Sequence, residues 1–174
     1  VDRVDVWQSP GSEYYRVVDY KTGKKDFDYC DVFNGVGLQM LLYLFALKKS
    51  GSSLLGEHSI PAGVQYFPAR VRYISTDGVP EPEQIEKERQ KDWKRQGLLL
   101  NDRAVLDAME PGEEKKRLPV KEKKGELTGY LADRQQMQLL EGYVMRVLGG
   151  LVEDIASGNV QPNPYTRGSS HNAC

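Results

Sequence analysis

The first 21 residues carry the pattern that most restricts how this chain can fold. Residues 1–7 and 14–20 alternate apolar and polar side chains, and the run Gln-Ser-Pro-Gly-Ser separates them. Alternation with a period of two is typical of strands with one buried face, and Pro-Gly is a turn signal. The sequence therefore predicts a β-hairpin with its turn at Pro10 and Gly11.

This turn position sets a register in which the numbers of facing residues sum to 21. Asp2 then faces Asp19, and Lys21 lies on the same strand face two residues further on. Another turn type would shift the register. On the opposite face the same register pairs Asp5 with Arg16, which we interpret as a surface ion pair worth under about 1 kcal/mol.

Two carboxylates and an ammonium at the open end of one strand face suggest a metal site. Facing carboxylates repel each other, and a divalent cation removes that repulsion. Mg²⁺ uses one or two carboxylates and keeps several waters, so a phosphate oxygen can join it. A lysine there can orient or help deprotonate an attacking water, which predicts phosphodiester hydrolysis. An Asp followed two residues later by Lys is more often an exposed ion pair, and the facing Asp2 is what favours a site.

A helix is predicted from Asp31 to Leu47, before the run Ser-Gly-Ser-Ser. Gln39 and Tyr43 are four residues apart and therefore share one face of it. An amide and a phenol suit phosphate or base contacts, although ordinary helix surface is the simpler interpretation.

The rest of the chain supplies further strands and helices. Strands are predicted over Ala62–Ile74, interrupted at Pro68, and over Gly97–Leu100, with a short helix over Arg103–Met109. The clearest helix runs from Asp133 to Ser157, and we expect its apolar stripe to be core. The stripe consists of Met137, Leu140, Val144, Val147, Leu151 and Ile155. The expected fold is α/β, with a mixed central sheet flanked by helices.

Charge is balanced over the whole chain but concentrated in one part of it. The 174 residues carry 24 Lys and Arg against 25 Asp and Glu, which excludes a strongly basic coat but not a local basic site. Residues 81–126 hold 12 of the basic and 12 of the acidic residues. We interpret them as a peripheral insertion, an exposed helix plus a mobile loop; DNA contact by residues 115–124 is the alternative.

Membrane, secretion and disulfide signals are missing from the sequence. No window reaches the roughly 18 apolar residues that a membrane span needs, and no signal peptide is visible. The two cysteines, Cys30 and Cys174, lie far apart, so a cytoplasmic setting is expected. Cys30 is expected to be a packed thiol, and neither His58 nor His171 is expected to bind metal.

Three of these segments, taken in order, resemble the RecB-like branch of the PD-(D/E)xK nucleases, which implies a restriction-endonuclease-like fold. That family carries a Gly-x-Ile-Asp strand, an Asp-x-Lys strand and a Gln-x-x-x-Tyr helix. The matching residues are Val1-Asp2, Asp19-Tyr20-Lys21, and Gln39 with Tyr43. The family's Gly, and its first helix with an acidic or His residue at the metal, would precede residue 1.

The resemblance implies a role for each of these residues. Asp2, Asp19 and the backbone carbonyl of Tyr20 would bind Mg²⁺ or Mn²⁺, and Lys21 would be the catalytic base or orient the water. Gln39 and Tyr43 would contact DNA or brace the site.

The remaining segments are similar to the C-terminal region of the AddB family of helicase-nuclease subunits. They are AGVQYFPAR, GLLLNDRAVLDAMEP and the long helix that leads to NPY and a final Cys. The similarity implies cleavage of single strands from unwound duplex ends in recombinational repair, with an AddA-type subunit as partner. A stand-alone RecB-like nuclease shares the chemistry, but these segments disfavour it.

Members of that family also hold a [4Fe-4S] cluster, with one Cys upstream of the nuclease motifs and three at the C-terminal end. Cys174 matches the first of those three, and the other ligands are not in this sequence. The cluster is therefore not expected to assemble in these 174 residues. The start without Met likewise suggests a piece of a longer chain.

We therefore expect one nuclease domain fragment over residues 1–174. Residues 1–49 would hold the catalytic hairpin and helix, 81–126 the charged insertion, 133–157 the long helix and 158–174 the tail leading to the iron–sulfur region. The alternative is a catalytically inactive module of the same fold that binds DNA or a partner subunit.

Overall fold

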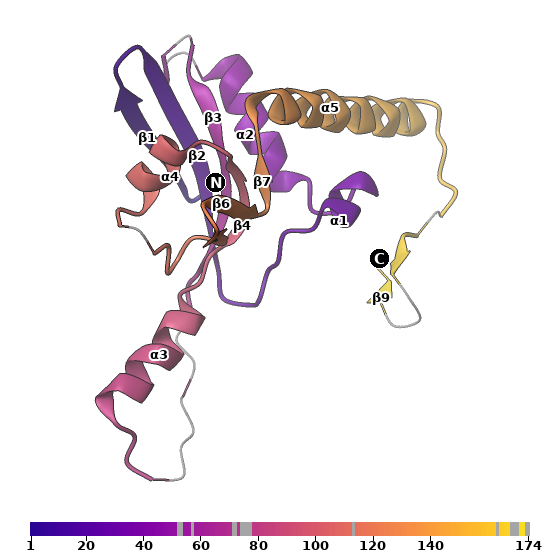
Figure 1. The fold of residues 1–174 in the computed structure, drawn as a ribbon. Helices are drawn as coiled ribbons and strands as arrows, with labels where there is room; N and C mark the ends of the chain where they lie inside the picture. The colour runs from indigo at the N-terminus through magenta and orange to yellow at the C-terminus, as the bar shows by residue number, and fades with distance from the viewer. Residues whose placement is uncertain are drawn as a thin grey trace.

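The computed structural model describes residues 1–51, 54–56, 58–70, 73, 78–112, 114–162, 164–167 and 171–172. A mixed sheet of five strands, in the order β1-β2-β3-β4-β7, forms the centre of this described part (Figure 1). Its strands are β1 (Arg3–Ser9), β2 (Ser12–Lys21), β3 (Ile60–Pro68), β4 (Gln96–Leu100) and β7 (Leu131–Ala132). β2 pairs with β3, and β4 with β7, in parallel, whereas the other two pairs are antiparallel. The expected α/β fold with a mixed central sheet is confirmed.

The hairpin β1–β2 has the register that the sequence predicts. Val4 pairs with Val17 and Asp5 pairs with Arg16. Gly11 closes the turn at a φ of +78°, a conformation that glycine adopts without steric cost. β1 begins at Arg3, so Asp2 lies just outside the ladder.

The prediction of a single helix from Asp31 to Leu47 is wrong. The chain forms a short helix α1 (Tyr29–Phe33) and a second helix α2 (Gln39–Ser50). Gly35 and Gly37, between them, adopt φ values of +77° and +70°. An α-helix needs negative φ at every residue, so these two glycines end the first helix and redirect the chain.

Cys30 is exposed, so the expectation of a packed thiol is also wrong. The residue lies in the first turn of α1, where its N–H donates to Asp28 Oδ1 at 2.7 Å. Val32, two residues further on, takes the buried position of this helix instead.

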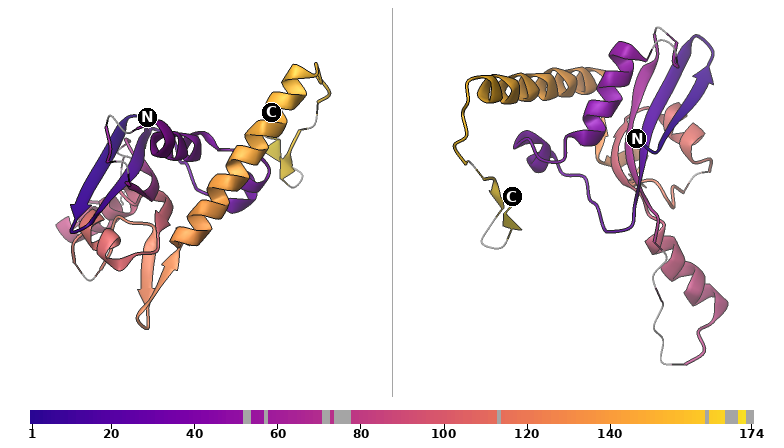
Figure 2. Two further views of the ribbon diagram at one scale, coloured as in Figure 1. Left: turned by 90° about the horizontal axis from the view of Figure 1, so that it is seen from above. Right: turned by 180° about the vertical axis from the view of Figure 1, so that it is seen from behind.

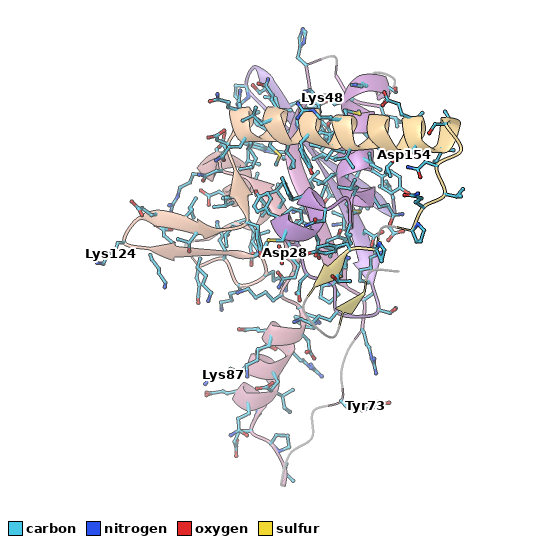
Figure 3. The ribbon with its side chains drawn as sticks, turned by 90° about the vertical axis from the view of Figure 1, so that its right-hand side faces the viewer. Asp28, Lys48, Tyr73, Lys87, Lys124 and Asp154 are labelled. Atoms are coloured by element: carbon cyan, nitrogen blue, oxygen red, sulfur yellow. The ribbon has the colours of Figure 1, made fainter. Side chains whose placement is uncertain are left out.

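Helices cover both faces of the sheet (Figure 2). On one face α2 and the long helix α5 (Arg134–Ala156) pack on side chains of β2, β3 and β4. Lys48 of α2, which Figure 3 labels beside α5, forms an ion pair at 2.6 Å with Glu141 of that helix. On the other face α4 (Arg103–Met109) and strand β5 (Val120–Lys123) enclose a smaller core. Its buried residues are Leu99, Leu106, Leu118 and Val120.

The apolar stripe of α5 is buried only in its first half. Asp133 caps this helix with a reciprocal bond to Gln136, as in a capping box. Met137 and Val144 are buried, but Leu151 and Ile155 are 48% and 78% exposed. The expectation of core packing is therefore wrong for the last two turns, because the helix runs on past the sheet (Figure 1).

Residues 81–126 are only partly peripheral. α3 (Pro82–Asp92) is an exposed helix, as expected, and it extends away from the sheet (Figure 1). β4, however, lies inside the central sheet, with Leu98 and Leu99 fully buried. Where a loop was expected, β5 pairs with β6 (Glu126–Gly129) in a hairpin with Lys124 at its tip (Figure 3).

Two further expectations concern the ends of predicted segments. β3 ends at Pro68, and Ile74, the expected end of that strand, lies outside the described residues. The tail, for which the sequence predicts neither a helix nor a strand, contains a pair of two-residue strands, β8 (Thr166–Arg167) and β9 (His171–Asn172). Cys174 also lies outside the described residues.

Candidate active site

Asp19 and Lys21 share one face at the end of β2. Lys21 Nζ lies 2.6 Å from Asp19 Oδ2, and Asp19 is only 8% exposed. No described residue makes a hydrogen bond of good geometry to this Oδ2, although a buried carboxylate normally collects several. The oxygen is held by a single ammonium and keeps capacity for another ligand.

Asp2 reaches the same end of the hairpin from the other strand. Continuing the β1–β2 register places it opposite Asp19, and its Oδ2 accepts the backbone N–H of Tyr20 at 2.7 Å. The exposed carboxylate of Asp2 therefore lies against the residue between Asp19 and Lys21. The structure thus brings the three predicted charged residues together at one strand end.

Tyr66 is a neighbour of Asp19 that sequence reasoning missed. It lies beside Asp19 in the parallel pairing of β2 with β3, and it is buried. Burial raises the pKa of the Tyr66 phenol, and the negative charge of Asp19 raises it further. The phenol therefore stays protonated at neutral pH and can donate a hydrogen bond.

Gln39 and Tyr43 lie on one face of α2, as their spacing predicts. Gln39 Nε2 donates to Tyr43 Oη at 3.0 Å. The hydroxyl of Tyr15, in the first half of β2, donates to the carbonyl of Leu44 at the middle of α2 at 2.8 Å. A helix that connects two parallel strands runs back along the sheet. The first turn of α2, with Gln39, therefore lies at the end of the sheet where β2 finishes.

A cavity of about 480 Å³ opens beside Lys21, and Tyr66 and Phe67 also line it. The lining holds six basic side chains and two carboxylates. Besides Lys21, the basic residues are Lys24, Lys25, Arg70, Lys91 and Lys94. This local excess of positive charge suits a polyanion, even though the whole chain is nearly neutral.

The donors at this site fit Mg²⁺ better than they fit an iron–sulfur cluster. Two carboxylates, with a backbone carbonyl, are a sufficient protein ligand set for Mg²⁺. Among the described residues no group of three or more His, Cys, Asp and Glu side chains could hold a metal ion, so this site offers only its two carboxylate side chains. A [4Fe-4S] cluster needs four cysteine thiolates, and the sequence contains two cysteines.

Comparison with known proteins matches the PD-(D/E)XK nuclease superfamily over residues 1–174. The chain belongs to this superfamily. The expected family is thereby confirmed, together with its mixed sheet and flanking helices. Within the described residues, no helix is long and apolar enough to cross a membrane.

Individual relatives are named as ATP-dependent helicase/deoxyribonuclease subunits of the AddB type. The protein of Acetivibrio thermocellus is 37% identical over 96% of this chain, and that of Clostridium kluyveri is 36% identical over the whole of it. The protein of Oceanobacillus iheyensis is 33% identical over 95%. The chain spans only 15% to 16% of the length of these relatives.

Proposed function

We propose that this chain is the metal-dependent DNA nuclease domain of an AddB-type helicase-nuclease subunit. The observation that carries the proposal is the buried Asp19, paired with Lys21 and adjoined by Asp2, at one end of a hairpin in a PD-(D/E)XK nuclease. The names of the relatives support deoxyribonucleic acid as the substrate.

The charged residues divide the work of hydrolysis. Asp2, Asp19 and the Tyr20 carbonyl would hold Mg²⁺, which supplies positive charge for the phosphate and acidifies water when it is bound. Lys21 Nζ, 2.6 Å from Asp19, would orient the attacking water and stabilise negative charge on the phosphate as an ammonium, and it would act as the base only after losing its own proton. The water oxygen forms the new bond to phosphorus, the P–O bond opposite it breaks, and the departing oxygen takes a proton from water or from the Lys21 ammonium.

The side chains around this centre would hold the strand. Gln39 and Tyr43 present an amide and a phenol at the same end of the sheet, and we propose that they contact DNA. The basic cavity beside Lys21 would receive the phosphates that follow the cleaved bond.

We extend the proposal to the biological role. The chain would degrade single strands from unwound duplex ends during recombinational repair of double-strand breaks, in a cytoplasmic complex with an AddA-type subunit. A [4Fe-4S] cluster that includes Cys174 would form only in a longer protein that supplies three more cysteines.

The test is Mg²⁺- or Mn²⁺-dependent degradation of single-stranded DNA, measured with the chain and with a longer protein that contains it. Asp19→Ala, the isosteric Asp19→Asn and Lys21→Ala should each abolish cleavage while circular dichroism shows an unchanged fold. Arg146→Gln, which removes an exposed charge from α5 outside the candidate DNA-contacting segments, is the matched control and should cleave normally.

A wild-type protein that is folded and inert in both forms would refute nuclease activity and favour a DNA- or partner-binding module. Cleavage that survives Asp19→Ala would place the catalytic centre elsewhere in the molecule.

A further inference from the structure

Four arginines gather around three aromatic rings on the sheet face opposite Asp19. The guanidinium carbons of Arg95, Arg3 and Arg16 lie 4.0, 5.0 and 5.7 Å from the ring centre of Phe67. Arg117 lies 5.7 Å from the ring of Trp93. We name these residues, Arg3, Arg16, Arg95 and Arg117, the arginine cluster. Tyr20, which accepts a hydrogen bond from Arg3 at 2.8 Å, is the third ring.

Two members of the arginine cluster share one carboxylate, and Arg95 has no ion pair with any described residue. Asp5 is within 2.8 Å of both Arg3 and Arg16, so the one carboxylate serves two cations. This pair, expected on the surface, is in fact partly buried, because the Arg16 side chain is only 11% exposed. Arg95 forms neither an ion pair nor a side-chain hydrogen bond with any residue that the structure describes, and it is half-buried.

The pKa of Arg95 indicates that the arginine cluster lacks negative charge. Burial lowers the pKa of Arg95 to about 10, and the positive charges of Arg16, Arg117 and Arg3 contribute to the lowering. The negative charge of Glu110 raises the pKa of Arg95, but the Glu110 carboxylate does not lie within ion-pair distance of the Arg95 guanidinium. The cluster therefore holds more positive charge than its carboxylates balance, which an added anion would relieve.

A second unmatched donor belongs to Gln65, which is fully buried on β3. Its Oε1 accepts a hydrogen bond from Arg16 at 2.6 Å, so the amide cannot be turned without setting two donors against each other. Its Nε2 then has no hydrogen-bond partner among the described residues. Buried donors without partners are rare, and here one occurs next to the arginine cluster.

We propose that the arginine cluster binds a backbone phosphate of the same DNA strand that enters the candidate active site. The inference takes from the proposed function only that DNA reaches this end of the sheet. A guanidinium fork matches a phosphate in geometry as well as charge.

Two observations favour a nucleic acid over an acidic protein segment. Tyr20, which is 43% exposed, offers a ring surface for a base among the cations, whereas Phe67 is buried beneath the guanidinium groups. Phe67, against which Arg95 lies, also lines the cavity that contains Lys21. The arginine cluster and the cavity that contains Lys21 therefore adjoin the same residue at this end of the sheet.

The test is equilibrium binding of a fluorescein-labelled single-stranded oligonucleotide to the full chain in a metal chelator, at several salt concentrations. Arg95→Gln should weaken binding about tenfold, as expected for one charge-assisted contact. It should also reduce the slope of log affinity against log salt by about 0.7, the value for one phosphate on a single strand. Arg95→Lys should keep the slope and recover only part of the affinity, because the charge remains and the fork is lost.

Arg146→Gln is the matched control, since Arg146 is an exposed arginine on α5 outside the cluster. Equal losses in Arg146→Gln and Arg95→Gln would overturn the proposal, because they would indicate general charge attraction. An unchanged slope in Arg95→Gln would also overturn it. If inorganic phosphate then still raised the Tm of the wild type but not of Arg95→Gln, the anion would come from another source.

Binding in chelator is independent of cleavage. A chain that shows the Arg95 effect but never cleaves with Mg²⁺ would refute the nuclease and leave the phosphate contact standing. A chain that cleaves normally but whose DNA binding is unchanged by Arg95→Gln would refute the phosphate contact and leave the nuclease standing.

Discussion

Asp19 and Lys21 form an ion pair that we expect to contribute to the stability of the fold. The Asp19 side chain is 12% exposed and the Lys21 side chain 36%, so removing the lysine leaves a nearly buried carboxylate without a counter-ion. Lys21→Met should therefore reduce the free energy of unfolding at neutral pH by about 1–2 kcal/mol, a value discounted for the exposure of the lysine. Asp19→Asn should cost less. Urea denaturation of both variants measures the difference, and the reverse order would show that the pair is not electrostatically coupled.

The pairing of residues in the hairpin, and the face on which each lies, could be predicted because side chains alternate between the two faces of a strand. The register of Asp5 with Arg16, and the shared face of Asp19 and Lys21, follow from the position of the turn alone. Tyr66 could not be found in this way, because it meets Asp19 through a parallel pairing between two strands that a long stretch of chain separates, from Lys21 to Ile60. No local pattern encodes such a pairing.

The same limit applies to the arginine cluster. Its members come from β1, β2 and the segments beside β4, and the sequence shows Arg95 only as one charge in a long charged run. What makes Arg95 special is its stacking on Phe67 and its lack of an ion pair with any described residue, which are properties of the packed sheet.

At the scale of elements, β3 and β4 approach each other through glycines. Gly97 has a φ of +143°, and a Cβ built on it would lie 2.0 Å from the carbonyl oxygen of Val64. Gly97→Ala should therefore lower the free energy of unfolding by about 3 kcal/mol or more, through strain and the loss of strand pairing. Gly23→Ala is the matched control, because a Cβ there meets no described atom within 4 Å. Chemical denaturation that gave equal losses for the two variants would contradict the close approach.

Glu13 ties the beginning of β2 to the loop that leads into β3. Its Oε1 accepts the N–H of Gly56 at 2.7 Å and the hydroxyl of Ser59. The hydrogen bond from Ser59 makes the largest contribution to lowering the pKa of Glu13 from 4.5, and the hydrogen bond from Gly56 makes the next largest. A carboxyl whose pKa is lower in the folded chain than in the unfolded chain stabilises the fold at pH values above the unfolded-state pKa. This stabilisation is lost as the pH falls through the folded-state pKa.

Glu13→Gln should therefore lower the Tm at pH 7, and the difference from the wild type should shrink below about pH 4.5. Thermal melts of both proteins between pH 7 and pH 3 measure this. A difference that did not change with pH would mean that the charge of Glu13 has no part in holding the loop.

Periodicity predicted the elements whose buried face is continuous, such as the hairpin and the first half of α5. It did not show that Gly35 and Gly37 would divide a helix, because the apolar pattern continues on both sides of them. It also missed β5 and β6, since Val120 is the only buried residue of these two described strands and the rest are charged or exposed to some degree.

For the whole molecule, the proposed metal site links stability to divalent cations. A cation that binds only the folded chain raises its stability in proportion to the logarithm of the free concentration over Kd. Mg²⁺ should therefore raise the Tm of the wild type progressively, and it should have little effect on Asp19→Asn. Differential scanning fluorimetry with NaCl at matched ionic strength separates binding from screening. An equal rise in both proteins would place the bound cation away from Asp19.

The parallel pairing of β2 with β3 gives the chain an order of assembly. The hairpin is local and can close in microseconds, but an isolated hairpin is at best marginally stable in water. Asp19 becomes buried only when β3 arrives beside it, after the intervening helices have been synthesised. During translation the proposed catalytic charges of the hairpin thus leave the ribosome before β3 does, and the burial of Asp19 follows only when β3 has paired. A nascent chain therefore carries the proposed catalytic charges before the fold has enclosed them.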